Sequence, residues 1–368
     1  MPEENNINQQ YNNDASEAET SGAEPLEQKT EIEQDRPIPQ YVTYIPYGFS
    51  PETYEERKKI KRAANIIGAS FLVMTAFILV LNFVSVFLIS FLSPVFNMNI
   101  SLEEPAVLHT LQIILSLSAF TVPFIICFKI GGERISDLIS FSKPEKELIL
   151  PFFLFGISFC FFANIAVSYA GSIFERFGIE YDVDFGDNPK GIFGFLLVLI
   201  STVIVPALVE EFACRGLILG LLRKFGDSFA IITSAILFGL MHGNFEQMPF
   251  AFLVGLVLGF ITVKSGSVLI AMAVHAFNNF ISVVFNSLLE GLTTVQQNIL
   301  YTVFLTLCLL GGLAALLLKS GSSAELFKLN PPETKATEGK KYKWFFCSVV
   351  IIIFIAYCLI ESLAFFVI

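Results

Sequence analysis

Residues 191–220 read GIFGFLLVLISTVIVPALVEEFACRGLILG. The segment 192–207 contains no charged residue and is typical of a membrane-spanning helix. It leads directly into two adjacent carboxylates, Glu210 and Glu211, and Arg215 follows one helical turn later. Each ionisable side chain at bilayer depth costs roughly 2.5–3.5 kcal/mol on insertion scales. We therefore expect these charged side chains to pair with one another or to form a functional site inside the membrane.

The composition of the chain indicates a polytopic membrane protein. Of its 368 residues, 54% are hydrophobic and 15% are charged, whereas a soluble protein of this length is about 25% charged. Several apolar stretches reach the roughly 20 residues that span a bilayer as a helix, so we predict an all-α bundle of about eight or nine transmembrane helices. The candidate segments are 64–93, 107–128, 148–170, 191–220, 228–244, 248–264, 267–285, 298–318 and 344–368.

Composition also divides the sequence into parts. Residues 1–50 hold ten Asp and Glu residues against Lys29 and Arg36, and they contain few large apolar side chains. Such a segment buries too little apolar surface to offset the entropy of ordering, so we expect it to be disordered. The predicted parts are an acidic disordered cytoplasmic tail at 1–60, transmembrane helices at 61–186, a four-helix unit carrying the intramembrane polar residues at 187–290, and C-terminal transmembrane helices at 291–368.

The distribution of Lys and Arg predicts an orientation. If the N-terminus lies inside, the inner segments hold eighteen of these residues, and the outer loops hold two, Arg176 and Lys190. Cytoplasmic loops carry an excess of Lys and Arg, so we expect a multi-pass protein of the cell membrane with a cytoplasmic N-terminus. The inner segments are 57–62, 129–147, 223–224, residue 264 and 319–343.

The chain has three histidines, and two of them fall well inside predicted membrane helices. His242 ends the stretch AILFGLMHGN, with Phe238 one turn before it on the same helix face. His275 opens the stretch HAFNNF. His109 lies near the start of the second predicted span, beside a polar stretch, and we interpret it as an interfacial bystander.

A polar stripe runs along the predicted helix that begins with His275. Its members are His275, Asn279, Ser282 and Asn286, with Asn278 one residue to the side. A stripe of this kind must face protein or water rather than lipid. At about 1.5 Å per residue, Glu210, His242 and His275 lie roughly 15, 21 and 12 Å from the inner ends of their helices. Helix boundaries are uncertain by a few residues, so the three side chains can share one depth and form a single intramembrane site.

The spacing within the first motif predicts a division of roles. Glu211 and Arg215 are four residues apart and can form an ion pair along the helix. Glu210 precedes Glu211 by one residue and points about 100° away from it. We therefore expect Glu211 to be held in a structural pair and Glu210 to be available for chemistry.

This set of side chains is compatible with several functions. A glutamate can act as general base towards a water, a histidine can orient that water or protonate a leaving amine, and Asn279 can donate to an oxyanion. Glu210, His242 and His275 also match the ligands of a catalytic zinc site. A structural ion pair with interhelical hydrogen bonds and a proton relay for transport use the same residue types. The residues alone leave these alternatives open.

Three motifs together resemble those of a known family. EEFACRG resembles the EExxxR motif of the CAAX protease and bacteriocin-processing (CPBP, or Abi) family, and FGLMH and HAFNN resemble its second and third motifs. The motifs occur in the family's order over about residues 190–287. Cys214 departs from the pattern, because an aromatic residue commonly precedes the arginine. We expect this change to alter local packing and to leave the chemistry in place.

The resemblance implies an all-helical intramembrane endopeptidase that opens towards the cytosol. By that likeness Glu210 activates a water with help from His242, His275 and Asn279 stabilise the oxyanion, and Glu211 and Arg215 order the site. The family is often labelled a metalloprotease, and the resemblance leaves open whether a divalent metal such as zinc takes part. We expect the lipid bilayer and a membrane-associated protein or peptide substrate as partners, and no nucleic acid. The alternatives are a non-catalytic scaffold or immunity protein of the same fold and a proton-linked transporter.

Overall fold

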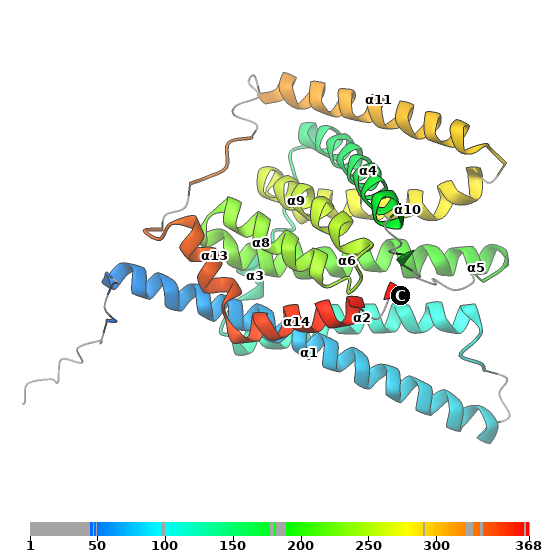
Figure 1. Ribbon diagram of the computed structural model, residues 1–368, viewed down its shortest axis with the longest axis horizontal. Coiled ribbons are helices and arrows are strands. Elements are labelled where there is room, and N and C mark those ends of the chain that lie inside the picture. Colours follow the sequence, from blue (N-terminus) through cyan, green and yellow to red (C-terminus); the bar gives the residue numbers. More distant parts are fainter. Residues whose placement is uncertain are drawn as a thin grey trace, which may run out of the picture. The chain divides into compact units, whose positions relative to one another are not determined.

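Helices make up most of the described part of the protein. The computed structural model describes residues 45–46, 48, 50–96, 100–176, 180–181, 189–289, 291–320, 327–331, 334–363 and 366–367. Most of the predicted acidic tail and the acidic residues Asp182, Asp184 and Asp187 lie outside these ranges. The helices, labelled where there is room in Figure 1, are α1 (Pro51–Val95), α2 (Pro105–Ile130), α3 (Ile135–Leu138), α4 (Lys146–Arg176), α5 (Gly191–Val198), α6 (Val205–Glu211), α7 (Leu219–Leu222), α8 (Asp227–Leu240), α9 (Gln247–Ser265), α10 (Val268–Leu289), α11 (Thr294–Ser320), α13 (Glu338–Phe346) and α14 (Val349–Leu363).

Short elements of other kinds complete the fold. Two π-helical segments, η1 (Leu199–Ile204) and η2 (Phe212–Ile218), interrupt the helix that runs from α5 to α7, and a 3₁₀ turn, η3 (Arg223–Phe225), ends it. Strands β1 (Glu180–Tyr181) and β2 (Phe366–Val367) form one antiparallel pair. The all-α class predicted from the sequence is confirmed, apart from this pair of two-residue strands.

The predicted number of spans is not confirmed. Six helices of the described chain are long and apolar enough to cross a bilayer: α1, α2, α4, the continuous stretch Gly191–Phe225, α9 and α11. Helices α13 and α14 meet at an angle of 72° and together make a seventh candidate. Helix α8 matches a predicted segment but is a shorter apolar helix, and α10 matches another and is apolar over Val268–Val283. The described part of the chain therefore has the six or seven span-like helices of a multi-pass membrane protein.

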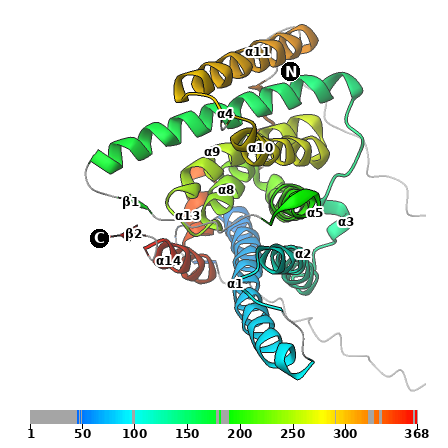
Figure 2. The same ribbon diagram turned by 90° about the vertical axis from the view of Figure 1, so that its right-hand side faces the viewer.

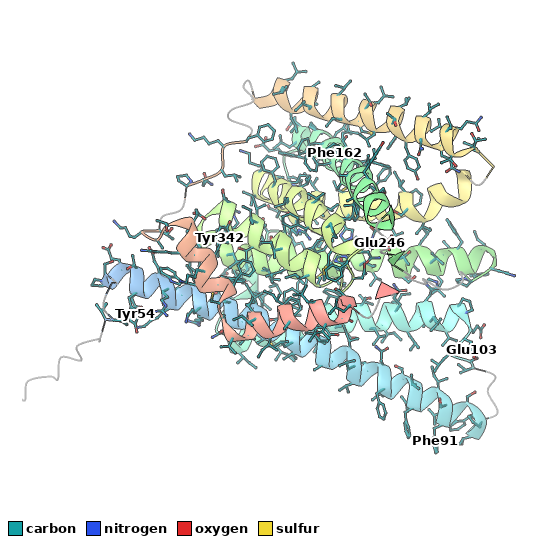
Figure 3. All side chains as sticks on the ribbon, in the orientation of Figure 1. Tyr54, Phe91, Glu103, Phe162, Glu246 and Tyr342 are labelled. Atoms are coloured by element: carbon teal, nitrogen blue, oxygen red, sulfur yellow. The ribbon has the colours of Figure 1, made fainter. Side chains whose placement is uncertain are left out.

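The start of α1 shows how local sequence sets a helix boundary. Ser50 caps the helix by accepting a hydrogen bond from the Thr53 backbone N–H, and the Thr53 side chain accepts one from the Ser50 backbone N–H. Pro51 at the first helical position already has the backbone angle that a helix requires. Helix α1 then continues for 45 residues. Its second half exposes large apolar side chains such as Phe91 (Figure 3), as expected for a surface that meets lipid.

The helices pack around two apolar clusters. The first joins α1, α2, the α7 region, α8 and α14, and its buried residues include Phe71, Phe238 and Phe354. The second joins α4, α9, α10 and α11, and Val254 and Val274 belong to it. In Figure 2, α4 lies between α11 and the α9–α10 pair, and α1, α2 and α14 lie on the other side of α8. The predicted polar site falls where the two clusters meet.

The basic segments predicted to be cytoplasmic contact one another at one end of the bundle. Arg62 donates to the Gly131 carbonyl at 2.5 Å, Lys224 lies 3.7 Å from the Glu133 carboxylate, and the Lys264 ammonium donates to the Lys328 carbonyl at 3.1 Å. These contacts involve five segments far apart in sequence, and a hydrogen bond from the Ser140 hydroxyl to the Gly266 carbonyl at 2.5 Å connects the last two to the others. This grouping is what a single cytoplasmic face requires.

The C-terminal helices pack directly on the bundle. The Phe354 and Phe71 rings stack with centroids 4.4 Å apart, and Tyr342 on α13 (Figure 3) lies 5.0 Å from the Phe229 ring. Buried Lys341 donates to the Phe225 carbonyl at 2.7 Å, at the end of the helix that carries the first motif. Helices α13 and α14 thus pack against the apolar core that surrounds α8.

Candidate active site

Glu210 and Glu211 occupy a short α-helical segment between two π-helical ones. Helix α6 spans seven residues, with η1 before it and η2 after it. Single π turns inside α-helices are rare and frequently occur at functional sites. Pro206 contributes to this irregularity, because it has no N–H to donate to the carbonyl four residues earlier, that of Thr202. Asn279 on α10 donates its side-chain amide to this carbonyl at 3.1 Å.

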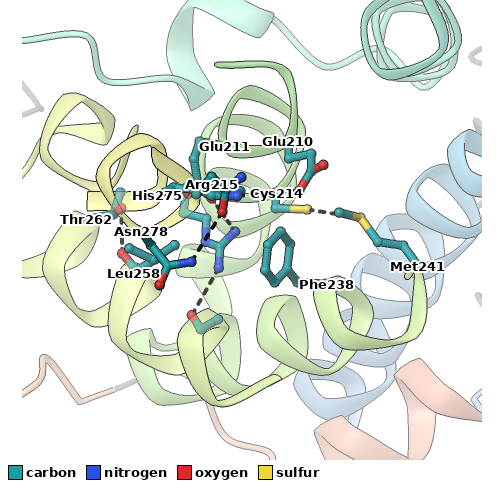
Figure 4. A network of polar contacts seen from close by, with 12 residues as sticks. Glu210, Glu211, Cys214, Arg215, Phe238, Met241, Leu258, Thr262, His275 and Asn278 are labelled. Carbon is teal, nitrogen blue, oxygen red and sulfur yellow. Dashed lines mark hydrogen bonds and ion pairs between the residues drawn. The ribbon is translucent and has the colours of Figure 1, made fainter. Parts of the chain in front are cut away.

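Glu211 and Arg215 form a fully buried ion pair. The Arg215 guanidinium donates to Glu211 Oε1 at 2.9 Å, and both side chains are 0% exposed. The same carboxylate oxygen accepts a hydrogen bond from His275 Nδ1 at 2.9 Å, and Arg215 also donates to the Gly255 carbonyl at 3.3 Å (Figure 4). Glu211 therefore ties α6 to both η2 and α10, as its spacing from Arg215 predicts.

Phe238 is the apolar centre of this network. Its ring lies 4.1 Å from the Arg215 guanidinium carbon and meets the His242 and His275 rings edge-on, with centroids 5.0 and 5.9 Å away. The face of the ring attracts the cation. Phe238 thus holds the arginine and both histidines in fixed relative positions. Cys214 packs beside it against Met241, with the two sulfur atoms 3.9 Å apart.

His242 lies on a turn just beyond the end of α8. Its Nδ1 donates to the Phe238 carbonyl at 2.7 Å, which leaves Nε2 as the nitrogen for a ligand. Asn244 stabilises the turn by donating to the His242 carbonyl at 3.1 Å and accepting from the Gln247 backbone N–H at 2.7 Å. Gly243 has φ +65°, which a residue with a side chain adopts only with strain. The turn is therefore built to present the His242 ring.

A cavity of about 230 Å³ brings the three motifs together. Its polar lining is Glu210, His242, Gln247, His275, Asn278, Asn279 and Ser282, and its apolar lining is Phe238, Phe250, Ala251 and Val254. His275 Nε2 lies 4.0 Å from Glu210 Oε2. Glu211 and Arg215 lie behind the cavity wall and act on it through His275. Glu210 Oε2 is buried and has no hydrogen-bond partner in the described part of the chain.

Comparison with known families identifies this region. Residues 192–281 match the family described as Type II CAAX prenyl endopeptidase Rce1-like. Residues 192–281 are similar to this family and are called the Rce1-like segment below. The match confirms the family resemblance of the three motifs, and it supports a CAAX-type intramembrane protease in general. Comparisons with curated proteins and with solved structures gave no match.

Two side chains of the Rce1-like segment extend the predicted set. Asn278 donates to Asn279 Oδ1 at 3.2 Å and lines the cavity, as does Gln247 at the start of α9. The i+3 spacing of Asn278 from His275 indicated that Asn278 lies near His275 on the same helix. Gln247 follows the His242 turn, and its place in the cavity depends on that turn, which helical periodicity does not describe. Ser282 of the predicted stripe also lines the cavity, and the Asn286 side chain lies outside the described residues.

The interpretation of His109 as an interfacial bystander is wrong. His109 is 9% exposed, and its Nδ1 lies 2.7 Å from the hydroxyl of Ser201 in η1. A bystander at the membrane surface would be exposed to water or headgroups. His109 is instead an interhelical contact between α2 and the first π-helical segment, next to the Rce1-like site.

The possible zinc site formed by Glu210, His242 and His275 does not fit the observed geometry. No group of three His, Cys, Asp or Glu side chains is placed to hold a metal ion in the parts of the chain that the structure describes. Glu210, His242 and His275 line one cavity, and His275 Nε2 lies 4.0 Å from Glu210 Oε2, but the three are not placed as a group that could hold the ion. We therefore derive no step through a metal.

Proposed function

We propose that the protein is an intramembrane endopeptidase that hydrolyses a peptide bond of a membrane-associated protein or peptide. The observation that supports this most directly is the contrast between two adjacent glutamates. Glu211 is bound by Arg215 and His275 through Oε1 and does not line the cavity, whereas Glu210 lines it together with two histidines and three side-chain amides. Oε2 of each glutamate is buried without a hydrogen-bond partner in the described chain, but only that of Glu210 belongs to a residue of the cavity. A buried acceptor of this kind is suited to hold a water.

In the proposed reaction, Glu210 takes a proton from a water whose oxygen attacks the carbonyl carbon of the substrate. His242 Nε2 orients that water, because its other ring nitrogen is already bonded to the Phe238 carbonyl. The new carbon–oxygen bond places a negative charge on the former carbonyl oxygen. Collapse of this intermediate breaks the carbon–nitrogen bond, and the proton held by Glu210 passes to the departing amine.

Two donors are available for the oxyanion. His275 donates a hydrogen bond from Nδ1 to Glu211 Oε1, and in its doubly protonated form it donates a second one from Nε2 into the cavity. The Asn279 amide uses one N–H on the Thr202 carbonyl and keeps the second for the substrate. Preorganised donors of this kind typically supply several kcal/mol of transition-state stabilisation, because they need not reorient during the reaction.

We further propose that the protein lies in the cell membrane with its N-terminus in the cytoplasm. The support is the grouping of the basic segments around Arg62, Lys224 and Lys264 at one end of the bundle. An N-terminal epitope is expected to resist external protease in intact cells and to be cleaved after permeabilisation. An epitope inserted in the loop after α4 is the matched control and should be cleaved in intact cells. Cleavage of the N-terminal epitope in intact cells would reverse the orientation.

Comparative analysis of released peptides tests the proposed proteolysis. Cells carrying wild type, Glu210→Gln or His275→Ala at matched expression are expected to differ in a shared set of cleavage products, present in wild type and absent from both variants. The exposed Glu103→Gln is the control and should retain those products. The sequences of the products would give the substrate class. Identical peptides from all four strains, in growth conditions where the substrate is present, would favour the scaffold alternative.

A further inference from the structure

His109 and Ser201 form a buried hydrogen bond between two helices. His109 Nδ1 lies 2.7 Å from the Ser201 hydroxyl, and the tautomer of the imidazole decides which of the two atoms is the donor. The hydroxyl also lies 3.2 Å from the Val198 carbonyl, and Ser201 is 0% exposed. Helix α2 thus holds the middle of η1 through Nδ1 of one imidazole.

Thr202, the residue after Ser201, supplies the backbone carbonyl that binds Asn279 of the active site. The Thr202 carbonyl accepts from Asn279 Nδ2, and the Thr202 hydroxyl donates to the same Val198 carbonyl as Ser201, at 2.7 Å. Because Pro206 has no N–H, the helix itself cannot satisfy the Thr202 carbonyl in the ordinary α-helical way. The direction of this carbonyl is therefore set by the π-helical backbone around it.

We propose that His109 is a positioning residue of the active site. It fixes Ser201 and with it the adjacent Thr202 carbonyl, and that carbonyl holds the Asn279 amide with its second N–H towards the substrate carbonyl. The proposal rests on the proposed endopeptidase function, but the structural connection is independent of catalysis. π-helical segments are rare and frequently occur at functional sites, and the contact from α2 holds this one in place.

Two amide substitutions separate this role from simple packing. In His109→Asn the side-chain nitrogen takes the place of Nδ1 and can still donate to Ser201, whereas in His109→Gln it reaches the place of Nε2 and cannot. We expect His109→Gln and Ser201→Ala to lower kcat roughly 10- to 100-fold with KM near the wild-type value, since small misplacements of a catalytic group have effects of this size. His109→Asn is expected to recover most of the activity.

A second readout does not require activity. With asparagine selectively labelled by nitrogen-15, the side-chain amide resonance of Asn279 is assigned by its loss in Asn279→Asp. We expect His109→Gln and Ser201→Ala to shift this resonance and His109→Asn to leave it near its wild-type position. The unfolding temperature of each variant in detergent shows whether the protein remains folded.

The outcomes distinguish the two proposals. An Asn279 resonance unchanged by His109→Gln overturns the positioning role, as does a lower unfolding temperature with unchanged turnover per folded molecule. A shifted resonance in a protein whose wild type cleaves nothing supports the positioning of Asn279 and rejects the endopeptidase function. A shifted resonance together with the loss of kcat and its recovery in His109→Asn supports both.

Discussion

Glu210→Gln is expected to lower turnover by roughly a hundred- to ten-thousandfold, the usual contribution of a general base. Glutamine keeps the shape of the side chain but cannot accept a proton from water. The variant should fold normally, because Glu210 Oε2 has no hydrogen-bond partner in the described chain to lose. The two measurements are the rate of cleavage of an identified substrate and the unfolding temperature of the purified protein.

The control for this prediction is a carboxylate of the same type away from the cavity. Glu103→Gln changes an exposed residue just before α2 (Figure 3) and should leave both turnover and unfolding temperature unchanged. A Glu210→Gln protein that keeps its activity would remove Glu210 from the role of base. The water would then have to be activated by another group of the cavity.

Glu211→Gln is expected to lower the free energy of unfolding by about 3–5 kcal/mol, the typical cost of removing one partner of a buried ion pair. The Arg215 guanidinium would remain buried at 0% exposure without its carboxylate, and His275 Nδ1 would lose a charged acceptor. Unfolding in a detergent titration measures this loss. Turnover should fall as well, but the stability change separates Glu211 from Glu210.

An exposed ion pair with nearly the same geometry is the matched control. Glu55 and Lys58 on α1 are 2.8 Å apart, with side chains 55% and 48% exposed. Glu55→Gln should change the free energy of unfolding by less than about 1 kcal/mol, because water screens and replaces the interaction. A Glu211→Gln protein that is as stable as wild type but inactive would contradict the division of roles between the two glutamates.

Local periodicity predicted the parts of the fold that depend on local interactions. Apolar runs located the helices, and the i,i+4 spacing of Glu211 and Arg215 predicted their ion pair, because neighbouring positions on a helix face each other whatever the tertiary structure. The predicted count of eight or nine spans is not confirmed, and the reason is physical. Helix α8 is apolar but only 14 residues long, and apolar composition alone does not distinguish a buried helix from one that crosses a bilayer.

The contacts that the sequence did not predict depend on segments of irregular backbone. The π-helical segments around α6 have no clear sequence signature, although a proline such as Pro206 is a common cause of a break in a helix. The bond from Asn279 to the Thr202 carbonyl and the contact of His109 with Ser201 both require that backbone. Gln247 enters the cavity because the Gly243 turn redirects the chain after His242. These features arise from tertiary packing and backbone geometry, which helical spacing does not encode.

Hydrolysis in labelled water tests the central claim most directly. The purified protein is reconstituted in lipid with a substrate identified from its cellular products, in water enriched in heavy oxygen. We predict that the new carboxyl terminus gains one solvent oxygen with wild type, and that Glu210→Gln at an equal unfolding temperature forms almost no product. Product formed by Glu210→Gln at the wild-type rate, or a product without solvent oxygen, would contradict water activation by Glu210.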